Sequence, residues 1–158
     1  MILGTDDDGR EHIRAVFLRR KEVYSLGEVA RLTGMQPAEL RREVRAGLRD
    51  ASKAGGLWRF TWRQLAYVAF SRWTLAEIHE ALGADAEKVL PPLLTLRSVT
   101  VRLPEYILQA LETIAADDGM TLDESLHEEL IDFAGTVSSR VGERIPGYRR
   151  AYMFPGGE

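Results

Sequence analysis

The chain has 158 residues, of which 45% are hydrophobic and 28% are charged, a composition typical of one or two small soluble domains. No apolar run approaches the roughly 18 residues that span a bilayer, and the acidic start Thr5-Asp6-Asp7-Asp8 has the wrong charge for a targeting peptide. We therefore expect a cytoplasmic protein with no membrane partner. The absence of cysteine excludes disulfides, thiol catalysis and cysteine-ligated metal sites.

The net charge of −3 is an average of two unlike segments. Residues 10–97 hold 16 Lys and Arg against 10 Asp and Glu, whereas residues 98–158 hold 5 against 11. Such an asymmetry indicates two modules with different partners. The basic segment alone suits a polyanion such as a nucleic acid.

The basic segment begins with a predicted helix, turn and helix. Ser25 and Glu28 have the spacing of a capping box, which predicts a helix from residue 25 to about 33. Gly34-Met35-Gln36 predicts a turn, and Pro37 opens a second helix to about residue 46. Basic side chains of the second helix lie away from its apolar positions, which favours contact with a polyanion.

A hairpin is predicted after these helices, with its turn at Gly55-Gly56. Alternation places Trp58 and Phe60 on one side as a buried pair and Arg59 on the outward side. Further capping boxes begin helices at Thr61 and Thr74. The aromatic residues around them are interpreted as core rather than as a ligand pocket.

Residues 24–83 resemble the winged helix-turn-helix of the MerR family. The matching motifs are Tyr24 to Gly34, Leu40-Arg41-Arg42 through Gly47-Leu48, Trp58-Arg59-Phe60-Thr61, and Gln64-Leu65 through Thr74 to Ile78. The resemblance implies that the second helix enters the major groove of DNA and that the wing contacts the backbone. The DNA-binding residues predicted from the motif and the basic patch are Arg41, Arg42, Arg45, Arg49, Lys53, Arg59 and Arg63.

A second module begins with a short predicted strand over residues 98–103, which alternates apolar and polar side chains. A lone strand leaves its backbone groups unpaired, so another copy of the chain is expected to supply its partner. A helix follows from Pro104 to about residue 116, and a capping box of Thr121 with Glu124 begins a second helix.

This strand, helix, turn and helix resembles the ribbon-helix-helix superfamily of DNA-binding dimers, through Val99 to Glu105, Gly119 and the capped second helix. The resemblance implies that outward strand residues read DNA, here Ser98, Thr100 and Arg102. Acidic residues crowd the second helix where a phosphate would be bound, so dimerisation is favoured and DNA reading stays open. The predicted dimerisation residues are Val99, Val101, Leu103, Ile107, Leu111, Leu126 and Leu130.

The tail, residues 135–158, shows no clear helical or strand period and is either a partner-binding segment that orders on binding or a loosely packed terminus. Its candidate partner-binding residues are Arg144, Tyr148, Arg149, Tyr152 and Phe154. The three histidines lack metal-ligand spacing, and no phosphate loop or nucleophile motif is present in the sequence. We expect no enzyme activity, no metal and no cofactor.

The sequence therefore predicts a mainly α-helical homodimer: an N-terminal arm (1–22), a MerR-like winged helix-turn-helix (23–96), a ribbon-helix-helix module with one intermolecular strand per chain (97–134) and the tail (135–158). The expected function is a sequence-specific double-stranded DNA-binding transcriptional regulator, a repressor. One alternative is an antitoxin that represses its own operon and binds a toxin protein through the tail. Another is a DNA-organising or plasmid-segregation protein.

Overall fold

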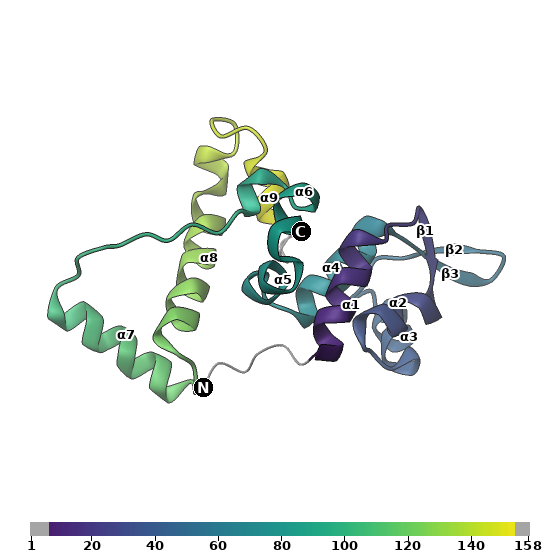
Figure 1. Cartoon of the computed structure of the whole chain (residues 1–158), viewed down its shortest axis with the longest axis horizontal. Helices are drawn as coiled ribbons and strands as arrows, with labels where there is room; N and C mark the ends of the chain where they lie inside the picture. The colour runs from purple at the N-terminus through teal and green to yellow at the C-terminus, as the bar shows by residue number, and fades with distance from the viewer. Residues whose placement is uncertain (1–6, 154–158) are drawn as a thin grey trace. The chain divides into compact units, whose positions relative to one another are not determined.

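The computed structural model describes residues 7–153, apart from the side chains at positions 150, 152 and 153, and is mainly helical with one three-stranded antiparallel sheet (Figure 1). The chain divides into two compact units, with the boundary between Leu96 and Arg97, and the second unit ends at Tyr152. Each unit has its own elements, and they are described in turn.

The first unit opens with helix α1 (Asp7–Leu18), within the segment that sequence reasoning treats as an arm. Ile13, Val16 and Phe17 are at most 1% exposed, and α1 packs against α2, α4 and α5. Because these three positions recur at helical spacing, they form one apolar stripe that leaves water on folding. Residues 7–18 are therefore a core element of the first unit and not an arm.

The predicted helix, turn and helix are confirmed as α2 (Leu26–Thr33) and α3 (Pro37–Arg45). Gly34 ends α2 in the left-handed conformation, with φ of 66°, which a glycine adopts without steric cost. Leu40 and Val44 of α3 are buried, so the opposite side of α3 is left to solvent.

A three-stranded sheet follows, in the order β1-β3-β2, from β1 (Val23–Ser25), β2 (Ser52–Ala54) and β3 (Leu57–Thr61). The predicted hairpin is confirmed, because β2 pairs with β3 across Gly55 and Gly56, which have φ of 57° and 79°. Figure 1 shows this hairpin extending beyond the helices of the first unit. Strand β1 is too short for sequence alternation to identify, and it joins the hairpin through its register with Phe60.

Helices α4 (Trp62–Arg72), α5 (Leu75–Leu82) and α6 (Ala86–Val89) complete the first unit, with short 3-10 turns over residues 83–85 and 92–94. Phe17 packs edge-on against Trp62 and Phe70, at ring-centroid distances of 6.1 and 5.8 Å. The Trp62 indole donates a hydrogen bond to the Val16 carbonyl at 3.0 Å, and the Arg20 guanidinium stacks on its ring. Phe70 is buried as expected, whereas Trp62 is half-buried.

All four predicted capping boxes are present: the side chains of Ser25, Thr61, Thr74 and Thr121 each accept from the backbone N–H three residues later, and the Glu or Gln there accepts in return. Each box satisfies two backbone donors that a helix start otherwise leaves without a partner. The starts of α2, α4, α5 and α8 are therefore set by local sequence.

The second unit contains α7 (Glu105–Asp117), α8 (Leu122–Val141) and all but the last residue of α9 (Tyr148–Met153), and α7 packs against α8. Helix α8 continues seven residues past the predicted module end, and the Tyr148 hydroxyl donates to the Ala134 carbonyl at 2.7 Å. The described part of the tail is thus helical over 135–141 and 148–153 rather than irregular. The Tyr148 hydrogen bond fixes the start of α9 against α8.

Residues 95–104 form neither a helix nor a strand in the single chain. The apolar side chains that alternate along this segment are exposed: Val99 to 80%, Val101 to 59% and Leu103 to 40%. On α8, Leu130, a predicted dimerisation residue, and Phe133 are 56% and 62% exposed. The second unit by itself therefore leaves a large part of its apolar surface in water.

Candidate nucleic-acid interface

The solvent face of α3 is basic. Helical periodicity of about 100° per residue puts Arg41, Arg42 and Arg45 on one side of the helix, and all three side chains are exposed. Leu40 and Val44 anchor the other side in the core. The burial of two apolar residues therefore fixes which way the three guanidinium groups face.

A groove lies between this helix, the start of α2 and the hairpin. Its basic lining residues are Arg41, Arg45, Lys53 and Arg59. Two of these cations come from α3 and two from the hairpin, and the remaining lining includes Leu57 and Trp58. The fold thus brings together four positive charges that are up to 18 residues apart in sequence.

The four groove cations have no acidic ion-pair partner among the described side chains. The Lys53 ammonium lies 5.4 Å from the ring centroid of Trp58, which holds it at the groove wall. Trp58 is only half-buried, unlike Phe60, because it lines the groove instead of entering the core. The β2–β3 register puts Lys53 and Arg59 on opposite faces of the hairpin, so the cations surround the groove from several sides. Four uncompensated cations around one groove create a positive potential that attracts anions.

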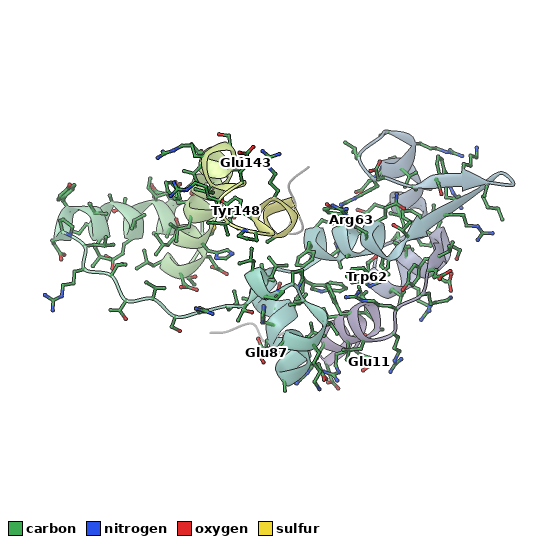
Figure 2. All side chains as sticks on the ribbon, turned by 90° about the horizontal axis from the view of Figure 1, so that it is seen from above. Glu11, Trp62, Arg63, Glu87, Glu143 and Tyr148 are labelled. Atoms are coloured by element: carbon green, nitrogen blue, oxygen red, sulfur yellow. The ribbon has the colours of Figure 1, made fainter. Side chains whose placement is uncertain are left out.

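The other three predicted DNA-binding residues lie outside this lining. Arg49 donates to the Glu43 carboxylate at 2.8 Å, and both side chains are about four-fifths buried, so this charge is neutralised locally. Arg42 is exposed on α3 beside the groove. Arg63, on α4, donates to the Tyr67 hydroxyl at 3.3 Å, and Figure 2 shows it pointing to a different side of the helix from Trp62.

Glu28 stabilises the start of α2 beside the groove. Its carboxylate accepts from the Lys21 ammonium and from the Ser25 backbone N–H, and these bonds lower the pKa of Glu28 to about 2. Ser25, Leu26 and Gly27 line the groove immediately before it. Because β1 ends at Ser25, this single capping box joins the sheet to the helix at the groove wall.

The possible second DNA-reading face, Ser98, Thr100 and Arg102, is fully exposed. At the start of α8, however, the capping box of Thr121 and Glu124 engages two of the N-terminal backbone donors. Those hydrogen bonds lower the pKa of Glu124, so its negative charge persists at this helix end. A carboxylate in this place opposes the binding of a phosphate.

The predicted dimerisation residues fall into two groups. Val99, Val101, Leu103 and Leu130 are exposed, whereas Ile107, Leu111 and Leu126 are half-buried between α7 and α8. All seven belong to the second unit. They form its unburied apolar surface and the rim of its small core.

The predicted partner-binding residues of the tail are only partly described. Arg144 and Arg149 are exposed, and Tyr148 is bonded to α8 through its hydroxyl. The side chain of Tyr152 and the whole of Phe154 lie outside the described residues. Within the described part of the chain, no three His, Asp or Glu side chains gather as they would around a metal ion.

No helix in residues 7–153 combines the length and apolar character needed to cross a membrane. Sequence reasoning missed β1 as part of the groove and was wrong about Trp58, which was expected to be buried with Phe60 and is half-buried at the groove. A three-residue strand carries too little alternation to be detected, and alternation gives the face of Trp58 but not how much of that face is covered.

Comparisons with models of known protein families, with curated proteins and with solved structures find no match. The functional argument therefore depends on the groove between α3 and the hairpin, its charges and their surroundings.

Proposed function

We propose that this chain is a sequence-specific, double-stranded DNA-binding transcriptional regulator that acts as a homodimer. In this proposal the first unit is a winged helix-turn-helix and the second unit is a ribbon-helix-helix module. The observation that carries the proposal is the groove in which Arg41, Arg45, Lys53 and Arg59 meet without acidic partners among the described side chains.

The geometry of the groove suits a DNA duplex. A single α-helix fits the major groove of B-form DNA, and the exposed charged side chains of α3 are Arg41, Arg42 and Arg45. The hairpin lines the same groove as α3 and carries Lys53 and Arg59. In this proposal these two side chains contact the phosphate backbone beside the major groove. Arginine and lysine together supply both bidentate and point-charge contacts to such a polyanion.

The second unit supports a dimer. Its first residues, 97–104, have backbone groups without a strand partner in the described chain, and the alternating side chains Val99, Val101 and Leu103 are exposed. A second copy would supply an antiparallel strand and cover these side chains together with Leu130 and Phe133. The occupied N-terminus of α8 and the acidic residues around it favour self-association over phosphate binding.

The test is binding to duplex DNA by fluorescence anisotropy, with sites first selected from a random duplex library. We expect Arg45→Ala with Arg59→Ala to weaken binding at least tenfold, because each removes a charged contact. The matched control is Arg10→Ala with Arg72→Ala, two exposed arginines on α1 and α4 that do not line the groove. The proposal fails if no duplex is enriched, or if both double variants bind as the wild type does.

The antitoxin alternative needs a tail that is available to a partner. In the described chain Tyr148 is bonded to α8, and the segment around it is helical. The structure offers no specific observation that favours a toxin or a role in DNA organisation, so the regulator is the function that we propose.

A further inference from the structure

This inference rests on the proposed function and concerns which DNA bases the exposed face of α3, here called the recognition surface, selects. The exposed face of α3 consists of Ala38, Arg41, Arg42 and Arg45, which the helical period places together. Alanine has no polar side-chain atom, and arginine carries five N–H donors and no acceptor. This face can therefore donate hydrogen bonds but cannot accept them.

The acceptor side chains of α3 are less exposed than its arginines. Glu39 and Glu43 are half-buried, and Glu43 accepts from Arg49. Gln36 precedes the first helical turn, and the helical period places it about opposite the basic face. The donor-only character of the face is thus a result of how α3 is anchored, and not only of its composition.

Base edges in the major groove differ in what they offer such a face. Guanine presents two acceptors, N7 and O6, whereas adenine and cytosine each present an amino donor that needs an acceptor on the protein. Thymine presents one acceptor beside a methyl group. An arginine can make a bidentate contact only with guanine, so a donor-only face discriminates in favour of guanine and against adenine and cytosine.

We infer that each recognition surface reads guanines in the major groove, through Arg41 and Arg42, while Arg45 contacts a phosphate. Helix-turn-helix proteins contact bases from the N-terminal side of the recognition helix, and of the three arginines Arg41 and Arg42 are nearer that end of α3 than Arg45 is. Arg45 is the last residue of α3 and lines the groove with Lys53 and Arg59 of the hairpin. The two arginines therefore select two guanines per half-site, and a dimer selects an inverted pair of half-sites.

The first experiment sequences the duplexes that the full-length protein retains from a random library. We expect guanine at two positions of each half-site. Arg41→Ala and Arg42→Ala should each relax one of these positions, with a loss of about 5- to 150-fold in discrimination against the other bases. Arg45→Ala should instead weaken binding to all sequences about equally, and circular dichroism checks that each variant is folded.

The second experiment replaces each selected guanine by 7-deazaguanine, which lacks the N7 acceptor but keeps its Watson–Crick pairing. We expect each replacement to weaken wild-type binding and to have no further effect in the variant that lacks the matching arginine. Arg41→Lys keeps the charge but not the planar fork, so it should retain the salt dependence of binding while losing guanine preference. This substitution separates base reading from charge.

The outcomes separate the two proposals. If duplex DNA is bound but the selected sites lack guanine at both positions, or 7-deazaguanine has no effect, the base-reading inference is wrong and the DNA-binding proposal stands. If no duplex is retained, both are wrong. Equal competition by an RNA duplex of the same sequence, whose major groove is too narrow for side chains, would also overturn major-groove reading.

Discussion

The two hairpin cations of the groove allow a quantitative prediction about salt. Each phosphate that a protein neutralises on B-form DNA contributes about −0.9 to the slope of log K against log salt concentration. Arg45, Lys53 and Arg59 are the three expected phosphate contacts, which gives a slope of about −2.7 per half-site. Replacing Lys53 and Arg59 by alanine should reduce that slope to about −0.9.

These slopes translate into affinities that are easily distinguished. Between 50 and 200 mM salt, the affinity of the wild type for a duplex with one half-site should fall about 40-fold, and that of Lys53→Ala with Arg59→Ala about 3.5-fold. The assay is anisotropy of a labelled duplex at several KCl concentrations. Because both side chains face solvent or the groove, the variant should keep its helical circular dichroism.

The control for this measurement is Arg10→Ala with Arg72→Ala, which removes the same charge from outside the groove. Its slope should stay near −2.7, because loss of net charge alone does not remove a phosphate contact. An unchanged slope in the hairpin variant, or an equal fall in the control, would refute the assignment of the hairpin to the DNA backbone.

Three further predictions concern stability and assembly. Leu40→Ala should lower the free energy of unfolding, measured in urea, by about 2–5 kcal/mol, because the Leu40 side chain of α3 is fully buried. Leu57→Ala should change that free energy little, because the Leu57 side chain is 60% exposed. The Glu28 carboxylate has its pKa lowered from 4.5 to about 2, so its stabilisation is complete above pH 4.5 and is lost as pH falls from 4.5 towards 2. Urea midpoints of the wild type should therefore fall relative to those of Glu28→Gln across that range, and parallel curves would contradict the role of the carboxylate. Val101→Glu should produce monomers in analytical ultracentrifugation, since it places charge on the exposed apolar face of the segment. Ser98→Glu, on the other face, should remain dimeric. A dimer of Val101→Glu would locate the interface elsewhere.

Most of the helices could be predicted because their starts are encoded locally. The side chains of Ser25, Thr61, Thr74 and Thr121 reach backbone groups only three residues away, so sequence spacing is enough to recognise them. The hairpin turn is similarly local, since two adjacent glycines adopt positive φ at no cost. Helix α1 has a different local signal, the helical spacing of the apolar residues Ile13, Val16 and Phe17, which sequence reasoning did not use.

The candidate site was predicted less completely. Sequence reasoning treated seven cations as equivalent, but Arg49 is neutralised by Glu43 and Arg63 is bonded to Tyr67 on α4. Whether a cation is free depends on which acidic or hydroxyl group the fold brings near it. Charge density along the sequence contains no information on that pairing.

The amino-acid order is sufficient for the features that depend on neighbours a few residues apart: the helix starts, the turn at Gly55-Gly56, the basic side of α3 and the division of charge near residue 97. The groove depends on long-range contacts, because β3 pairs with β1 and packs against α2, and α2 in turn packs against α3. Those contacts select four of the basic residues and leave Trp58 half-buried at the groove. Local propensities act over one helical turn, whereas the burial of apolar surface acts across the whole unit, and it is the latter that assembles the site.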